Sequence, residues 1–257
     1  MKQLTVCLLL LCLAGCGSNA NIELEKGNAF LDREDWDTAI SCFTEAIRLD
    51  PNFADAHYSR GLAYYDKGDY DKAIANCTEA IRLDQNFAKA YNNRGDAYGR
   101  KGDYNKAIAD YSDVIRLEPT FTVAYNNRAF AYAKNGDSDK AIADHSEAIR
   151  LDPNFAPAYN NRGLMYGVKG EHDKSIADYT EAIRLDPNDS LVYRNRGLAY
   201  DIKGDYDKAI ADHSEAIRLD PNFARAYHNR GFAYQAIGEK AKAEADRAKY
   251  EELKSDK

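Results

Sequence analysis

The chain has 257 residues, of which 44% are hydrophobic and 30% are charged, so it can bury a core and is not a disordered tail. Its net charge of −7 excludes the basic footprint with which nucleic-acid-binding proteins neutralise phosphates. The five cysteines show no CxxC or other metal-ligand spacing. The sequence therefore predicts no nucleic-acid partner, no metal site and no cofactor.

The first residues are expected to direct export. Lys2 precedes an apolar run of about ten residues, which is too short to span a bilayer, since a spanning helix needs about 20 residues. Small residues follow the run, as in secretory signals. We therefore predict a signal peptide over residues 1–15.

The signal ends in the sequence LAGC, residues 13–16, which resembles a bacterial lipobox. The resemblance implies cleavage before Cys16 and lipidation of Cys16 with acyl chains such as palmitate. Two or more chains on one residue would anchor the protein stably to a membrane. Gly17 stands where an aspartate would favour inner-membrane retention, so the outer membrane, facing the periplasm, is expected. Residues 16–20 would be the lipidated cysteine and a short tether; a plain signal peptide with a chance cysteine is the alternative.

A 34-residue period fills the rest of the chain, over residues 21–254. With Ala20 as repeat position 1, the windows begin at residues 20, 54, 88, 122, 156, 190 and 224, without insertions. Position 11 is aromatic and position 20 is small. Position 8 is glycine in every window but one: Gly27, Gly61, Gly95, Ala129, Gly163, Gly197 and Gly231.

Each window predicts two helices. Apolar residues recur at helical spacing over positions 1–14 and again over positions 17–30. Glycine at position 15 suits a left-handed helix end, and aspartate at position 16, as in Asp69 and Asp103, can accept from the first N–H groups of the next helix. Proline at position 32, such as Pro51, would stop the second helix.

This pattern resembles the tetratricopeptide repeat along the whole mature chain. The resemblance implies an all-α fold, a right-handed α-solenoid of seven helix pairs. In the seventh repeat Glu244 and Glu251 replace isoleucines, and Arg247 replaces an aromatic residue. Residues 241–254 are therefore expected to form a C-terminal cap helix.

An asparagine column is the first candidate site. In the family, position 6 lies on the first helix and faces a concave groove, where some members bind the backbone of an extended peptide. A carboxamide suits this task because it offers both a donor and an acceptor. The structural alternative is that asparagine is common there in generic repeats. The candidates are Asn93, Asn127, Asn161, Asn195 and Asn229 at position 6, with Asn92, Asn126 and Asn160 at position 5.

An apolar patch is the second candidate, predicted from Leu164, Val168, Leu198 and Ile202, with room near Gly167. A basic clamp for C-terminal carboxylates, known in other family members, is not predicted. Such clamps have lysine at position 5 and arginine at position 6, and neither occurs in this chain.

An arginine stands at position 7 of every repeat but the first, and an oxygen acceptor follows it sixteen residues later, as in Arg162 and Asp178. The first repeat has Lys26 and Cys42 at these two positions. We predict ion pairs between the two helices, because a guanidinium fork matches a carboxylate. Lysine at position 19 is expected to compete for the same aspartate at i−4 spacing.

Two pairs of residues with reactive side chains are assigned packing roles. His145 and His213 occupy position 24, which is aromatic in the first, third and fifth repeats, so we expect packing rather than catalysis. Cys42 and Cys77 are expected to be packed or free thiols, with a disulfide as the alternative.

These features favour an interaction protein over an enzyme, since phosphate-binding loops and nucleophile elbows are absent from the sequence. The expected function is a protein-binding scaffold of the bacterial envelope, which holds an extended segment of a partner in its concave groove. The resemblance to lipoproteins of this architecture implies an assembly or localisation factor, either similar to a secretin pilotin or an adaptor for a cell-wall enzyme. The alternative is a structural lipoprotein that self-associates through its outer helix faces.

Overall fold

The computed structural model describes residues 19–255, so the expected signal peptide, Cys16 and Gly17 lie outside the described residues. Within residues 19–255 the chain forms fourteen α-helices and no strand. It divides into two compact units, which are described separately: the first ends at Pro119 and the second begins at Thr120. None of these helices is both long and apolar enough to cross a membrane.

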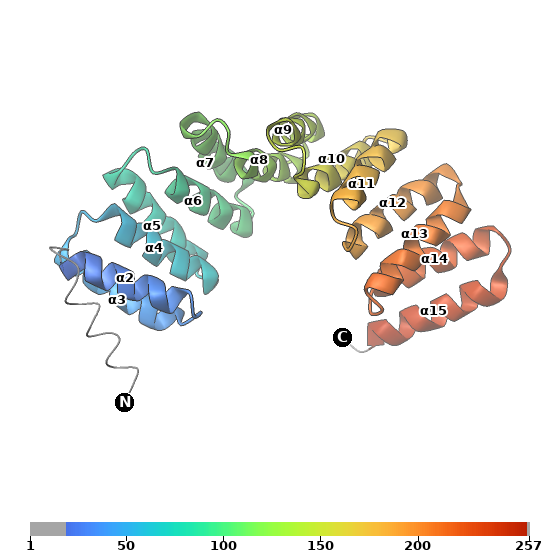
Figure 1. Cartoon of the computed structure of the whole chain (residues 1–257), viewed down its shortest axis with the longest axis horizontal. Helices are drawn as coiled ribbons and strands as arrows, with labels where there is room; N and C mark the ends of the chain where they lie inside the picture. The colour runs from blue at the N-terminus through green and yellow to red at the C-terminus, as the bar shows by residue number, and fades with distance from the viewer. Residues whose placement is uncertain (1–18, 256–257) are drawn as a thin grey trace. The chain divides into compact units, whose positions relative to one another are not determined.

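The first unit contains three antiparallel helix pairs (Figure 1). The first helices of its pairs contact each other, and the second helix of each pair packs on the first helix of the next pair. The helices are α2 (Asn19–Leu31), α3 (Trp36–Leu49), α4 (Ala54–Asp66), α5 (Tyr70–Leu83), α6 (Ala88–Lys101) and α7 (Tyr104–Leu117).

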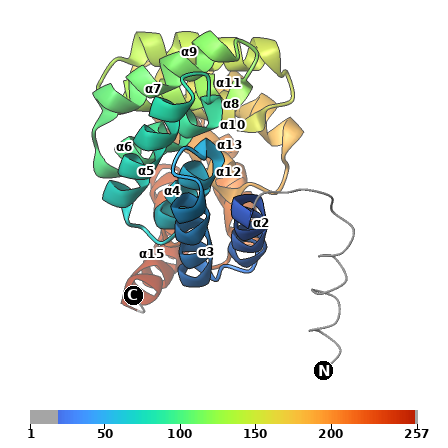
Figure 2. The same cartoon turned by 90° about the vertical axis from the view of Figure 1, so that its left-hand side faces the viewer.

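The second unit contains four such pairs, stacked in chain order (Figures 1 and 2). Its first helices, α8, α10, α12 and α14, contact one another in sequence and are called the first-helix layer below. The helices are α8 (Thr122–Lys134), α9 (Ser138–Leu151), α10 (Ala156–Val168), α11 (His172–Leu185), α12 (Ser190–Lys203), α13 (Tyr206–Leu219), α14 (Ala224–Ala236) and α15 (Lys240–Ser255).

The all-α fold and the seven helix pairs are thus confirmed. The predicted cap is also confirmed, because α15 is the last described helix and most of its residues are exposed, including Glu244, Arg247 and Glu251. Charged side chains at positions that are apolar in the other repeats keep this end hydrated.

The first helices end as predicted, on glycine at position 15. Gly68 and Gly102, for example, have φ of 81° and 82°, a left-handed conformation that side chains with a Cβ rarely adopt. At position 16, Asp69 accepts from the Lys72 N–H at 3.2 Å, as predicted. The same prediction was wrong for Asp103, which makes no side-chain cap and pairs with the Lys106 ammonium at 3.1 Å.

At the end of the second helices, an aspartate side chain forms a turn beside the predicted proline stop. The Asp50 carboxylate accepts from the Asn52 N–H at 3.0 Å, in the turn around the predicted Pro51 stop. Asp84 accepts from Asn86 N–H at 2.9 Å although Gln85 replaces the proline. The aspartate turn therefore ends α5 without any help from proline.

Small residues let the paired helices approach closely. In the third repeat, a Cβ added to Gly95 would lie 2.9 Å from the Tyr111 ring, and Ala107 is fully buried beside it. Gly163 and Tyr179 repeat the arrangement, with a corresponding distance of 3.0 Å. We call this the ring slot: a small residue at position 8, another at position 20, and a buried ring from position 24 between the helices.

The predicted arginine–aspartate pairs are confirmed. Arg162 Nε and Nη2 donate to the two carboxylate oxygens of Asp178 at 2.8 and 2.7 Å. The prediction that lysine competes for the same aspartate was wrong, because Lys140, at position 19, pairs with Asp137 at 2.7 Å and not with Asp144. The equivalent pairs are Arg94–Asp110, Arg128–Asp144, Arg196–Asp212 and Arg230–Asp246, and Arg60 donates to the Asn76 oxygen.

The same arginines also connect neighbouring repeats. Arg162 Nη1 donates to Ser146 Oγ of the preceding repeat at 3.0 Å, so one guanidinium joins α9, α10 and α11. Thr44, Thr78, Thr180 and Ser214 receive the equivalent bond from Arg60, Arg94, Arg196 and Arg230.

The cysteines and histidines have the predicted packing roles. Cys42 and Cys77 are free thiols, and burial raises the pKa of the Cys77 thiol to about 12. His145 and His213 are both buried at position 24. His213 Nε2 lies 2.9 Å from Asp201 Oδ2, an acidic partner that the sequence did not predict.

Candidate functional site

The predicted asparagines lie on first helices in both units. In the second unit they form hydrogen bonds with one another: Asn161 Nδ2 donates to Asn126 Oδ1 at 3.2 Å, and Asn195 Nδ2 donates to Asn160 Oδ1 at 3.3 Å. Each bond joins position 6 of one repeat to position 5 of the preceding repeat. We call this set the amide ladder. Each bond of the ladder uses one N–H of one asparagine and one acceptor site of the other. A carboxamide has two N–H donors and two acceptor sites, so the remaining ones can bond a peptide ligand.

The amide ladder stops at the sixth repeat, where position 5 is Arg194. An arginine cannot accept, so the Nδ2 of Asn229 is buried without a hydrogen-bond partner. Arg194 Nη1 donates to Asn195 Oδ1 at 3.1 Å, while its Nε is also buried and unpartnered. Burial, followed by repulsion from Arg225, lowers the pKa of Arg194.

In the first unit the hydrogen bonds of Asn92 and Asn93 differ from those of the amide ladder. Asn92 Nδ2 donates to Asp96 Oδ2 at 3.1 Å, and Tyr111 Oη donates to Asp96 Oδ1 at 2.6 Å. Burial raises the pKa of Asp96, and the two hydrogen bonds oppose that rise. Asn93 is buried, and its Nδ2 has no hydrogen-bond partner. Sequence reasoning missed Asp96 as a structural acceptor, although Asp96 is polar at position 9, where the second and the fourth to seventh repeats have leucine or phenylalanine.

The predicted apolar patch is on the surface of the second unit. Leu164, Val168, Leu198 and Ile202 are exposed, with exposed fractions between 39% for Leu198 and 68% for Val168. Beside Gly167 there is room for a methyl group, because a Cβ there would meet only Ser175 Oγ, at an ordinary contact distance of 3.4 Å.

Two exposed phenylalanines extend the patch along the first-helix layer. Phe130 on α8 and Phe232 on α14 stand at position 9, like Leu164 and Leu198, and are 50% and 59% exposed. They lie in the fourth and seventh repeats, outside the fifth and sixth repeats that carry the predicted patch. The six residues form what we call the apolar row: Phe130, Leu164, Val168, Leu198, Ile202 and Phe232.

The first-helix layer therefore offers two kinds of contact. Position 9 lies three or four residues after positions 5 and 6, so amides and apolar side chains share neighbouring turns of each helix. Apolar side chains can anchor a partner, and amides can hydrogen-bond its backbone regardless of sequence. No group of acidic, histidine or cysteine side chains suited to hold a metal ion occurs in residues 19–255.

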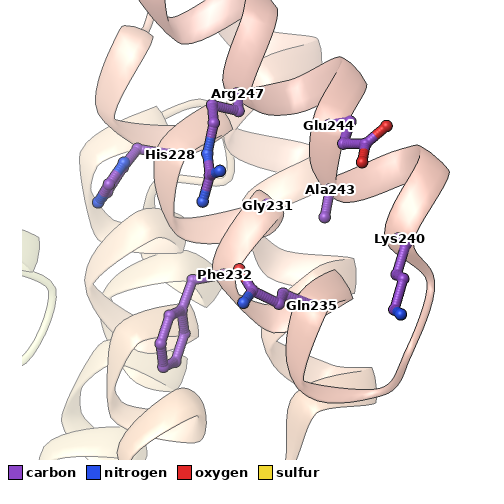
Figure 3. Close-up of a pocket in the computed structure, with 8 residues that line it drawn as sticks. All are labelled: His228, Gly231, Phe232, Gln235, Lys240, Ala243, Glu244 and Arg247. Carbon is purple, nitrogen blue, oxygen red and sulfur yellow. The ribbon is translucent and has the colours of Figure 1, made fainter.

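A pocket lies at the end of the second unit, between α14 and α15 (Figure 3). Its volume is about 440 Å³, and Gly231 and Ala243 lie in its lining together with Phe232 of the apolar row. The polar lining residues are His228, Gln235, Lys240, Glu244 and Arg247.

Comparison with known proteins agrees with this architecture. Sequence models described as tetratricopeptide repeat match residues 24–88, 88–121, 122–155, 156–189 and 178–211, and one described as TPR repeat matches residues 202–238. No curated protein matches the chain by sequence.

Solved structures share the fold. A crystal structure of MamA protein is 30% identical with a TM-score of 0.60, covering 67% of this chain and 94% of that one. A tetratricopeptide repeat protein from Parabacteroides merdae is 22% identical with a TM-score of 0.73, covering 92% and 94%. YrrB, described as a TPR protein with an unusual peptide-binding site, is 22% identical with a TM-score of 0.60, covering 72% and 96%.

Helix pairs, repeat phase and sequence matches agree over almost the whole described chain. Proteins of this architecture generally act as non-catalytic scaffolds for protein interactions. The chain belongs to the tetratricopeptide-repeat family.

Proposed function

We propose that this protein is an interaction scaffold of the bacterial envelope that holds a segment of a partner protein on the first-helix layer of its second unit. The observation that carries the proposal is the apolar row, since six large hydrophobic side chains are exposed on four helices that contact in sequence. Such a concentration of exposed apolar side chains is typical of interaction sites in soluble domains.

The remaining amide groups of the ladder support an extended ligand. They border the apolar row and can bond backbone N–H and C=O groups whatever the partner's side chains are. The peptide-binding site named for YrrB is consistent with this mode of binding. The partner would thus be anchored by apolar side chains and aligned by its own backbone.

Site-specific photo-crosslinking in the native envelope tests this function. A photoreactive residue in place of Val168, the most exposed member of the apolar row, should form adducts with a different protein. These adducts should be lost on the further change Leu198→Asp, because a carboxylate disfavours an apolar contact. The matched control is the same probe at Ala177, an exposed residue of the second helix α11. Adducts of the chain with itself, formed only at Ala177, would instead support self-association and refute the proposal.

The envelope location rests on the N-terminal sequence. Lys2, the short apolar run and the lipobox-like residues 13–16 would give a protein held at the outer membrane by acyl chains on Cys16. The Cys16→Ser chain should therefore appear in the soluble fraction when membranes are separated, whereas the unchanged chain should sediment with the outer membrane. Equal membrane association of both chains would contradict lipid anchoring.

A further inference from the structure

The ring slot shows what normally fills the space between paired helices. In the third and fifth repeats, Tyr111 and Tyr179 fill it and are 5% and 3% exposed. In the sixth repeat His213 takes the same place, and a Cβ on Gly197 would lie 2.6 Å from its ring. In these repeats glycine at position 8 is matched by a ring from position 24, whereas in the second repeat the Cys77 side chain lies against Gly61, with Sγ 2.9 Å from an added Cβ.

The seventh repeat keeps the slot but lacks the ring. Gly231 and Ala243 hold positions 8 and 20, while position 24 is Arg247, an exposed residue. A Cβ on Gly231 would meet Asp246 Cβ at 3.3 Å and the backbone of Ala243 and Arg247, but no ring. This missing ring accounts for the pocket of about 440 Å³ at this place (Figure 3).

The pocket's surroundings favour an aromatic occupant. Phe232 supplies an apolar wall, and Figure 3 shows it with Arg247 on one side of Gly231, with Lys240 on the other. Neither Lys240 nor Arg247 forms an ion pair within the described part of the chain. Free cations beside an apolar slot attract the electron-rich face of an aromatic ring more than an aliphatic group.

We propose that this pocket binds an aromatic side chain of the partner segment, as the terminal anchor of the interaction. The proposal rests on the proposed function, because Phe232 belongs both to the pocket and to the apolar row. The partner's ring occupies the slot that Tyr111 and Tyr179 fill from within their own repeats. The bound segment thus completes the packing that the seventh repeat leaves open.

The test is a titration of the purified protein with p-cresol, the side-chain analogue of tyrosine, followed by NMR of the backbone amides. Saturable shifts are expected at Gly231, Phe232 and Ala243. The matched probe 4-methylcyclohexanol has a similar size but no π-face, and it should bind about threefold or more weakly. Equal affinity for both probes, or no saturable shift at Gly231 and Ala243, would overturn the proposal.

Two substitutions at one position make the test specific. Arg247→Tyr fills the slot from within, as in the third and fifth repeats, and should weaken p-cresol binding at least about tenfold while raising the thermal stability. Arg247→Gln leaves the slot open but removes one of the two cations, so it should weaken p-cresol binding by only about threefold, less than Arg247→Tyr. Unchanged binding in Arg247→Tyr refutes the pocket. Since crosslinking at Val168 does not depend on p-cresol, a failure here leaves the proposed function testable by itself.

Discussion

Replacing Asp178 with leucine should destabilise the protein by about 3–5 kcal/mol, more than replacing both Asp178 and Arg162. Asp178 accepts two hydrogen bonds from Arg162, and their side chains are only 9% and 19% exposed. Without the carboxylate, the guanidinium would remain charged and mostly shielded from water. The double change Arg162→Leu and Asp178→Leu removes both charges and should cost less than Asp178→Leu alone.

Urea unfolding of the purified chain measures these differences as a double-mutant cycle. The matched control is Arg184–Glu181, also an arginine–carboxylate pair on α11, which lies at the surface with side chains 61% and 35% exposed. Glu181→Leu should change the free energy of unfolding by less than about 1 kcal/mol. Additive costs at Arg162 and Asp178 would show that the two side chains do not act as a pair.

His145 should make the second unit less stable in mild acid. Burial, followed by repulsion from Arg162, lowers the pKa of His145 to about 4 in the folded protein. In the unfolded chain its pKa is about 6.5, so between these values only the unfolded state binds the proton. Stability therefore falls as the pH drops from about 6.5 to about 4, and His145 alone should account for about 3 kcal/mol of that loss.

The matched variant combines Ala129→Gly with His145→Tyr, which recreates the ring slot of the third and fifth repeats with a group that does not titrate in this range. The glycine is needed because Tyr111 and Tyr179 pack against position 8 where only glycine leaves room. The free energy of unfolding of both proteins is measured from pH 4 to pH 7. Parallel curves for the two proteins would rule out His145 as the cause of acid sensitivity.

The fold could be predicted because its determinants are local and repeated. Gly95, Ala107 and Tyr111 recur in phase with equivalent residues elsewhere, so one pattern specifies both helices and the close contact between them. Arg162 and Asp178 could be paired for the same reason, since an arginine and an oxygen acceptor keep the same separation in every repeat but the first. The exposed apolar patch followed from residues that break the repetition on an otherwise regular helix face.

Contacts between repeats were harder to predict. Asn161 and Asn126 are 35 residues apart, and their hydrogen bond depends on the offset between adjacent first helices, which no spacing within one repeat encodes. The missing cap at Asp103 could not be predicted either, since the equivalent Asp69 combines a cap with the same kind of lysine pair. The terminal pocket required the structure, since an arginine at position 247 reads only as a solvated cap residue in the sequence.

Each position-7 arginine, such as Arg162, bonds three helices in the same way, and this allows repeats to be lost or duplicated in the gene. Its partners are an aspartate within the repeat and a hydroxyl in the repeat before. In the second unit the fourth to sixth repeats all supply the arginine, the aspartate and the hydroxyl, whereas the last repeat has Ala248 at the hydroxyl position. Loss of the segment encoding residues 156–189 would bring Ser146 opposite Arg196, whose own partner Asp212 is retained. Unequal exchange between such near-identical segments can therefore shorten or lengthen the protein while each junction keeps its bonds. The array can change the length of its binding surface without evolving a new interface.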